Sequence, residues 1–361
     1  MRILERYVTW SYIGAFILCI TLLMVLGIIG DVLGFLDDIF KNNIPLSSIL
    51  AFYFYFAPFA FVNMIPFACL LSAVYVFNSL SKNHEVTAVV ASGLSLWKLL
   101  RPVLMVTFAL CLLAFIVNDR FVPTTMEKAN RVRMEELEQA AEGGVTIRNL
   151  AIYGKGGQII FARSYNPAKK VLNNVIVHRQ DKEHVITKKI SAREMKWQSD
   201  KTWMGLDVIV FRVDPEGDFD GEPVIYKKKV IGIKETPKDF INTQWDPRYM
   251  SLRQLRKYLK IFRASSPTTV RRLLVEFNYK LAFPFTAMVT ILMGVPFCIE
   301  TGRGNALIGM ARGITVAMLY LPVMALSLAL GKGGTLPPFV AAWFSNVLFV
   351  LLGIYFINKK G

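Results

Sequence analysis

The chain has 361 residues, 54% of them apolar, and a formal net charge of +16. With a positive mean hydropathy, this composition excludes an ordinary water-soluble enzyme and indicates a membrane protein. The excess of positive charge would suit nucleic-acid binding only if the basic residues faced the cytosol.

Six apolar runs approach or exceed the roughly 20 residues that a helix needs to cross a bilayer. The first run is longer than the core of a secretory signal and no A-x-A-like cleavage site follows it, so we expect it to remain as a span. The four cysteines all fall inside these runs and are expected to behave as small apolar residues. The predicted spans lie near 9–30, 49–77, 99–118, 277–299, 305–330 and 337–357.

Basic residues in the short connections predict the orientation, because lysine and arginine beside a span resist translocation. They gather at alternate ends of the spans and at both chain termini, which places both termini in the cytoplasm. Most of the net charge lies between the third and fourth spans and therefore outside the cytosol, which argues against nucleic-acid binding. The residues are Arg2, Arg6, Lys82, Lys98, Arg101, Arg303, Arg312, Lys359 and Lys360.

A short polar segment, "SKNHEVTAVVASG" at 81–93, separates the second and third spans. It predicts a cytoplasmic helix capped by Asn83, with Glu85 in the first turn and Gly93 as its stop. Its valines recur on one face. This pattern fits either a plug for a groove on another protein or a solvated loop helix.

From about 135 to 245 the span-length runs give way to short alternating segments such as "QIIFARSY" and "TWMGLDVIVFRV". These predict an antiparallel sandwich or jelly roll. His178 and His184 lack partners at metal-ligand spacing and are expected to be surface histidines. We find no catalytic set of nucleophile, base and orienting group, and no cofactor motif.

The segment "SLRQLRKYLKIFRAS" alternates leucines with basic residues at helical spacing. It predicts a basic amphipathic helix that either lies on the outer leaflet or packs on the β domain. Glu276 and Lys280 open the fourth span four residues apart, which most simply predicts a self-neutralising pair and less readily a proton relay. "GKGGT" lacks the phosphate-binding spacing, and "HEVTA" lacks the second histidine of a zinc protease.

Several strings occur in a distinctive order: "ERYV", "GFLDDIFK", "NSLSKNHEVTAVVASGLS", "FVP", "EFNYKLAFP", "GVPF" and "LPP". In this order and topology they resemble the LptF/LptG lipopolysaccharide export permeases over essentially the whole chain, and the G member more than the F member. The resemblance implies six transmembrane helices with an inserted periplasmic jelly-roll-like domain. The expected parts are 1–134 with a coupling helix near 83–93, the β domain at 135–245, and a linker helix with the last spans at 246–361.

The resemblance also implies the function. Such a protein is an inner-membrane permease subunit of an ABC exporter that extracts lipopolysaccharide and passes it to a periplasmic bridge. It implies as partners an LptB-like cytoplasmic ATPase dimer that hydrolyses ATP, a second LptF-like permease, and an LptC-like single-span accessory protein. No cofactor, catalytic residue or metal is implied. The alternative class is a non-transporting scaffold or signalling protein that links a periplasmic partner to a cytoplasmic one.

By position, Glu85 matches the coupling-helix acid that contacts the ATPase. Lys41 and Arg133 match basic residues that face the lipid phosphates, and Tyr320 matches an aromatic residue lining the cavity. Gly34 and Phe40 stand where the G member carries basic residues, so phosphate recognition on the first span is expected to be weaker or relocated.

Overall fold

The computed structural model describes most of the chain: residues 2–34, 45–140, 147–154, 158–166, 169–180, 186–198, 202–213, 219–233, 235–237, 240, 247–262, 267–299 and 306–360. Among these, six helical stretches are long and apolar enough to cross a bilayer, which confirms the predicted spans. They are Ile3–Gly34, Leu46–Lys82, Leu96–Arg133, Val270–Cys298, Ile308–Gly333 and Pro338–Lys359.

Several spans are built from more than one helix. The third continues from α5 through a π-helical turn, η1, into α6, and the fourth is interrupted by a 3-10 turn, η4, that contains Pro284. Proline cannot donate the backbone hydrogen bond that an uninterrupted helix needs. The helices are α1 (Arg2–Gly34), α3 (Leu46–Lys82), α4 (Glu85–Ala91), α5 (Leu96–Ile116), η1 (Val117–Phe121), α6 (Val122–Ala140), η3 (Pro247–Tyr249), α8 (Leu252–Phe262), α9 (Pro267–Ala282), η4 (Phe283–Phe285), α10 (Thr286–Cys298), α11 (Ala306–Met318), α12 (Tyr320–Gly333) and α13 (Pro338–Lys360).

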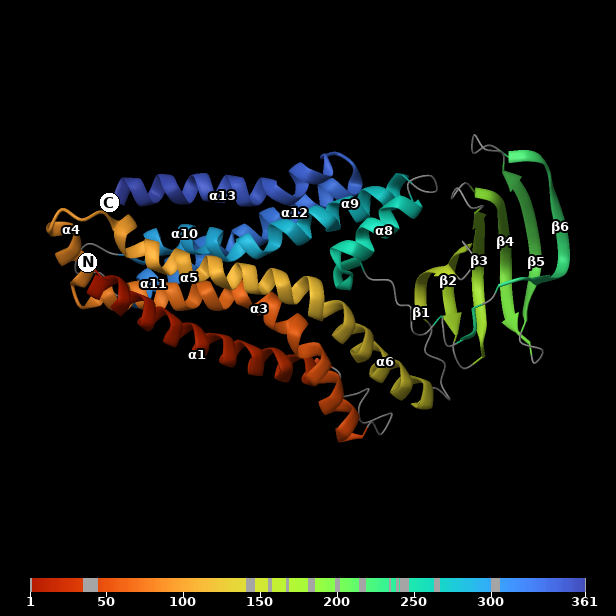
Figure 1. Ribbon diagram of the computed structural model, residues 1–361, viewed down its shortest axis with the longest axis horizontal. Coiled ribbons are helices and arrows are strands. Elements are labelled where there is room, and N and C mark those ends of the chain that lie inside the picture. The colour runs from red at the N-terminus through yellow and green to blue at the C-terminus, as the bar shows by residue number, and fades with distance from the viewer. Residues whose placement is uncertain are drawn as a thin grey trace.

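The molecule is elongated, with the helical bundle at one end and the sheet at the other (Figure 1). Both chain ends and α4 lie at the end of the bundle far from the sheet. Helix α8 lies between the bundle and the sheet. This arrangement puts α4 and the sheet on opposite sides of the apolar region.

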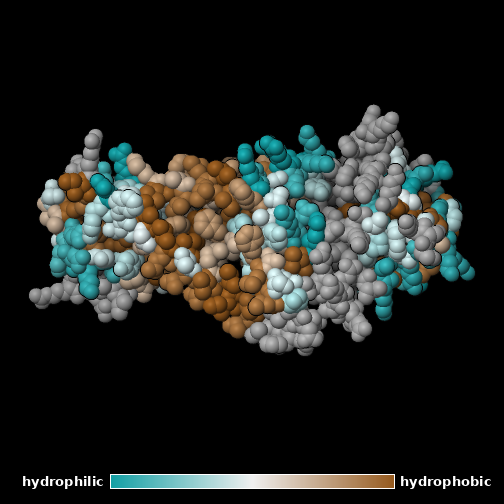
Figure 2. All heavy atoms as spheres, turned by 60° about the horizontal axis from the view of Figure 1, so that its bottom comes forward, coloured by the Kyte–Doolittle hydropathy of each residue, from teal (hydrophilic) through white to brown (hydrophobic). Residues whose placement is uncertain are grey.

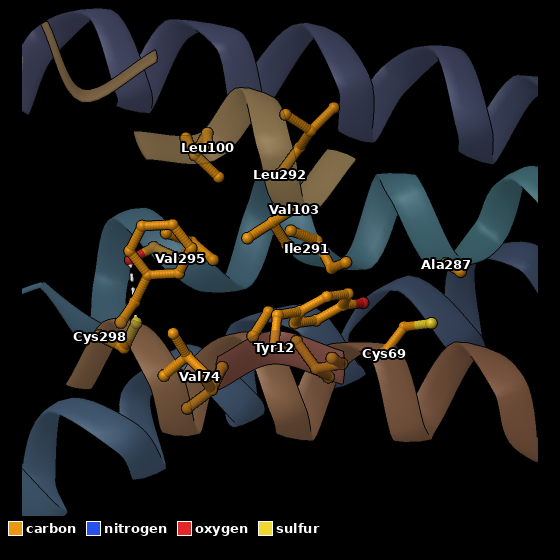
Figure 3. Packing of buried hydrophobic residues seen from close by; sticks show 14 of the residues in the cluster. Tyr12, Cys69, Val74, Leu100, Val103, Ala287, Ile291, Leu292, Val295 and Cys298 are labelled. Atoms are coloured by element: carbon orange, nitrogen blue, oxygen red, sulfur yellow. Dashed lines mark hydrogen bonds between the residues drawn. The ribbon is translucent and has the colours of Figure 1, made fainter. Parts of the chain in front are cut away.

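The core of the bundle joins helices that are distant in sequence. Tyr12 of α1, Val74 of α3, Val103 of α5 and Ile291 of α10 belong to one buried cluster (Figure 3). The Tyr12 hydroxyl also forms a 2.9 Å hydrogen bond with the Thr107 hydroxyl of α5. These contacts fix α1 beside α5.

Helices α10 and α11 pack unusually closely. A Cβ atom at Gly313 would lie 2.8 Å from the backbone oxygen of Gly294, and one at Gly309 would lie 2.9 Å from that of Cys298. Gly309 and Gly313 form a G-x-x-x-G pattern, which lets membrane helices approach without side chains between them. The close contact therefore depends on both glycines.

Large apolar side chains remain exposed around the bundle. Figure 2 shows a broad hydrophobic band between two more polar ends. Leu22 and Leu26 of α1 and Leu351 of α13 are 54%, 63% and 62% exposed. Such a continuous surface is stable only against lipid or another apolar chain.

The inserted all-β part is confirmed as an antiparallel sheet of six strands in the order β1-β2-β3-β4-β5-β6. Each described strand pairs with its neighbours in sequence. The described strands thus form one meander rather than two facing sheets, because successive strands turn directly back on one another. They are β1 (Ile147–Gly154), β2 (Gln158–Asn166), β3 (Val171–Gln180), β4 (Ile186–Trp197), β5 (Trp203–Val213) and β6 (Phe219–Ile231).

Helix α8 packs on protein with its apolar side. Leu255 is fully buried in a cluster with Ile159 of β2 and Leu273 of α9. Arg256 lies over the ring of Phe277 of α9, with 5.5 Å between the guanidinium carbon and the ring centroid. The apolar side of this basic amphipathic helix is observed to pack on protein, on both β2 of the β domain and α9 of the bundle. The helix joins the sheet to the bundle.

Candidate functional site

Helix α4 differs in detail from its predicted form. The residue before the helix is His84, in a left-handed conformation with φ 58°, and no side chain caps the helix. Asn83 instead ends α3, and its side-chain amide donates a 3.4 Å hydrogen bond to the Glu85 carboxylate. The predicted Asn83 cap is therefore wrong. Gly93 does follow the helix with φ 77°, as expected for a residue that ends a helix.

The valine stripe of α4 faces the bundle. Val86 is 2% exposed, and Val89 and Val90 pack against the same core cluster. The outward positions carry Thr87, Ala88 and Ala91, while Glu85 is half-buried at the start of the helix. A partner could therefore reach only small residues and one acid on α4, so a valine-lined plug is excluded.

Arg133 lies on α6 near the ends of α1 and α3. Its side chain is exposed, and it is close enough to Tyr53 of α3 to interact electrostatically. The Tyr53 hydroxyl donates a 2.8 Å hydrogen bond to Asp31 of α1. Lys128, also on α6, lies over the ring of Tyr55 at 5.5 Å. Two cations of α6 thus stand beside aromatic side chains of α3.

Lys41 and Phe40 lie outside the described residues. Gly34 ends α1, and a Cβ at this position would meet nothing within 4 Å. Lys128 did not emerge from the sequence, because its position five residues before Arg133 suggests no common helical face. Its location beside Tyr55 is evident only from the packing of α6 on α3.

Tyr320 is a core residue, only 1% exposed, in a cluster formed by α10, α12 and α13. Its hydroxyl donates a 2.5 Å hydrogen bond to Asn346 and lies 3.1 Å from the Thr286 hydroxyl. The Asn346 amide donates in turn to the backbone oxygen of Ala282 at 3.0 Å. This buried hydrogen-bond network links α9, α10, α12 and α13 at the level where η4 interrupts the fourth span.

A second set of polar side chains lies at the junction of the bundle with α8. Glu276 pairs with Lys332 of α12 at 2.5 Å, and Lys280 donates a hydrogen bond to the backbone oxygen of Met250. The predicted Glu276–Lys280 pair is therefore wrong: each side chain has a partner elsewhere in the fold. Asp119 of η1 accepts a hydrogen bond from Leu252 at the start of α8.

One face of the sheet carries an uninterrupted line of apolar side chains, one from each strand. Residues paired across antiparallel strands lie on the same face. The line is buried at β1 to β4 and opens toward β6, where Val224 is 51% exposed. We call this line the apolar row; it consists of Ile152, Ile160, Val177, Ile190, Val210 and Val224.

The segment after β6 covers the buried part of this face. Phe240 is fully buried and packs against Tyr165 and Trp203, with ring centroids 5.7 and 5.3 Å apart. The Trp203 indole donates a 2.8 Å hydrogen bond to the backbone oxygen of Glu235. The buried half of the face is therefore closed by this segment, while the β6 side remains open.

Metal binding has no support among the described residues: no group of three or more His, Cys, Asp or Glu side chains could hold an ion. The four cysteines are free, and three of them, Cys69, Cys111 and Cys298, are buried. His178 is partly buried on β3, and burial, with a smaller effect of Lys189, lowers its pKa. His184 lies outside the described residues.

Comparison with protein-family models gives a match over nearly the whole chain. A family model described as "Lipopolysaccharide export system permease LptF/LptG" matches residues 6–359, which is nearly the whole chain. The match does not distinguish the G member from the F member. A comparison with curated proteins found no match.

Proposed function

The chain belongs to the LptF/LptG family of lipopolysaccharide export permeases, and from this membership we propose that it is one permease subunit of an ABC-type exporter. In this proposal it extracts lipopolysaccharide from the outer leaflet of the inner membrane and passes it to a periplasmic bridge. Its partners are an LptB-like ATPase dimer, an LptF-like second permease and an LptC-like accessory protein. The termini are cytoplasmic and the sheet is periplasmic, with the domain limits 1–134, 135–245 and 246–361.

Coupling to the ATPase is assigned to α4. Support comes from its location at the end of the bundle that also holds both chain ends (Figure 1). Glu85 stands at its first turn, and the outward side chains of Thr87, Ala88 and Ala91 are small. A helix with small outward residues allows close approach of a partner surface, and the single acid can pair with a cation there.

Headgroup binding is assigned to Lys41 and Arg133, with Lys128 as a third cation. Support comes from the location of Arg133 and Lys128 on α6, at the side of the bundle nearer the sheet. Phosphate groups are bound by such cations at headgroup depth. Tyr320 is assigned a positioning role, because its buried hydroxyl ties together three helices of the bundle.

The observation that carries the transport proposal is the apolar row. Acyl chains cost about 0.8 kcal/mol per CH₂ in water, so a lipid that leaves the bilayer needs continuous apolar cover. The row runs across all six strands of the sheet and becomes exposed at Val224. A sheet built only to dock a partner would not require such a line to run from a closed end to an open one.

The test is site-specific photo-crosslinking in the assembled exporter. A photoreactive residue at Val210, beside the open end of the apolar row, should crosslink to lipopolysaccharide when ATP is supplied. The matched control is Ile209, which neighbours Val210 but points to the opposite face because side chains alternate along a strand. Equal lipid crosslinking at Ile209 and Val210, or crosslinking independent of ATP, would contradict the proposed path.

The alternative, a scaffold that links two partners without transport, predicts a different pattern. Protein crosslinks would persist at the edge strand β6, for example from Ile225, which is 70% exposed. Lipid crosslinks at Val210 would be missing. The purified complex would then hold neither an ATPase nor an amphiphile.

A further inference from the structure

A hollow of about 560 Å³ lies between α1 and α5 near the start of both helices, apart from every residue assigned above. Its lining includes Glu5, Arg6 and Thr9 of α1, and Arg101 and Met105 of α5. Its volume falls in the range of ligand pockets, roughly 300–1,000 Å³. It lies at the end of the bundle that holds both chain ends and α4 (Figure 1).

The two arginines lie at the same depth. Tyr12 and Thr107 share a hydrogen bond of 2.9 Å that fixes the register of α1 against α5. Arg6 and Arg101 each precede their member of this pair by six residues, which corresponds to about 9 Å along each helix at 1.5 Å per residue. Because both helices start at the same end of the bundle (Figure 1), Arg6 and Arg101 lie at a similar level along the two helices, and both line the same hollow.

An apolar groove continues from this hollow toward the middle of the bundle. It has a volume of about 360 Å³ and is lined by Trp97, Arg101, Leu104, Met105, Phe108 and Met288. Arg101 and Met105 line both the hollow and the groove, so the two adjoin each other. Phe108 and Met105 are 44% and 56% exposed, which leaves the groove open to the surrounding bilayer.

The charges favour a phosphate. Within the described part of the chain, neither Arg6 nor Arg101 forms an ion pair. Glu5 is the acid in the hollow, so its net charge is +1 from two cations and one anion. Two unpaired guanidinium groups beside an apolar groove match a phosphate linked to an acyl chain.

We propose that this hollow and groove bind an anionic glycerophospholipid, with the phosphate between Arg6 and Arg101 and one acyl chain along Leu104, Met105 and Phe108. Glu5 can accept hydrogen bonds from hydroxyls of a glycerol headgroup. This end of the bundle is cytoplasmic in the proposed function, so the lipid would lie in the cytoplasmic leaflet. The leaflet therefore rests on the proposed function, whereas the binding itself does not. The lipid would act as a bound structural ligand of α1 and α5, separate from the exported lipid.

The test uses the full chain with its co-purifying partners, reconstituted in nanodiscs that contain equal parts of phosphatidylglycerol, phosphatidylethanolamine and phosphatidylcholine. Retained lipid is identified by native mass spectrometry, and a photoreactive residue at Phe108 reports the acyl chain. Replacing Arg6→Gln and Arg101→Gln should lower retention of phosphatidylglycerol about fivefold per arginine. Lys98→Gln is the matched control, since Lys98 is an exposed cation of α5 outside the hollow.

A second variant, Met105→Trp, fills the groove without changing charge and should reduce the acyl crosslink at Phe108. Excess inorganic phosphate should not displace the lipid, because the groove holds the acyl chain; displacement by phosphate would overturn the lipid assignment. Glu5→Gln should increase phosphatidylglycerol retention, because it removes a negative charge near the phosphate while its amide oxygen can still accept hydrogen bonds from the headgroup hydroxyls. The proposal is wrong if phosphatidylethanolamine is retained more strongly than phosphatidylglycerol and Glu5→Gln weakens the retention of phosphatidylethanolamine. It is also wrong if Lys98→Gln loses as much phosphatidylglycerol as the double variant of Arg6 and Arg101.

Retention in nanodiscs needs neither ATP nor export. A wrong transport proposal would therefore leave this result unchanged. Conversely, absence of bound phosphatidylglycerol in a complex that still exports lipopolysaccharide would overturn the lipid site alone.

Discussion

Asp119 in the third span accepts a 2.7 Å hydrogen bond from the backbone N–H of Leu252, the first residue of α8. At the same helix end, Ser251 accepts from the N–H of Gln254 at 3.1 Å, and Gln254 accepts from the N–H of Ser251 at 2.7 Å. The start of α8 is thus capped from its own chain segment and from the bundle. Because α8 also packs on Ile159 of the sheet, this contact connects the membrane spans to the β domain.

Replacing Asp119→Ala should loosen this connection. A capping side chain and a carboxylate at a helix start together contribute about 1–2 kcal/mol. We expect faster amide hydrogen exchange in α8 and a lower unfolding temperature in detergent. Asp119→Asn keeps an oxygen acceptor and should lose less, and equal losses for the two variants would contradict the capping role.

The cap of α8 has a local part, which can be predicted from the sequence, and a long-range part, which cannot. Ser251 and Gln254 form the S-x-x-Q pattern of a capping box, which is visible in the sequence before the predicted helix. Asp119 is 133 residues away from Leu252. It lies in a π-helical turn just beyond the apolar run, and nothing in the local pattern of "VNDRF" indicates its partner.

Glu85→Lys should weaken binding of the ATPase while the membrane fold stays intact. A charge-assisted hydrogen bond is worth roughly 1.5–3 kcal/mol, which corresponds to about 10- to 150-fold in affinity. Co-purification of the ATPase and its stimulated turnover are the measurements. Glu85→Gln keeps the shape and should have an intermediate effect. Normal ATPase binding by Glu85→Lys would remove α4 from the coupling role.

Apolar patterns were the dependable part of the sequence. Span number and the all-β insert follow from run length and alternation, because both depend on which face must be buried. The partners of individual polar side chains were less predictable. Glu276 and Lys280 have the right helical spacing for each other, yet Lys332 and the Met250 backbone are nearer in the fold. The valines of α4 are periodic, but periodicity alone does not say whether the bundle or a partner covers them.

The headgroup assignment predicts a salt-dependent loss. Replacing Lys41→Ala and Arg133→Ala together should weaken lipopolysaccharide retention, and more at low salt than at high salt, because screening reduces the contribution of exposed charges. Crosslinking yield at several ionic strengths measures this. Lys257→Ala is a control that removes an exposed cation from α8. Unchanged retention and salt dependence in the double variant would require the phosphates to bind elsewhere.

Tyr320→Phe removes only the hydroxyl that joins Thr286 of α10 to Asn346 of α13. Asn346 would still donate to the backbone oxygen of Ala282, but its side-chain oxygen would lose the hydrogen bond that the Tyr320 hydroxyl donates to it. The expected loss of stability is about 1–2 kcal/mol, since polar contacts between membrane helices contribute amounts of this order. It should appear as a lower unfolding temperature of the purified protein.

Tyr279→Phe is the matched control, because the Tyr279 hydroxyl has no hydrogen bond within the described part of the chain, although its ring packs on Phe283. A positioning role for Tyr320 predicts that lipid crosslinks weaken only as far as the bundle is destabilised, and that lower temperature restores them. A direct lipid contact predicts instead that crosslinking falls at every temperature with stability unchanged. That outcome would return Tyr320 to the cavity lining that the family resemblance implies.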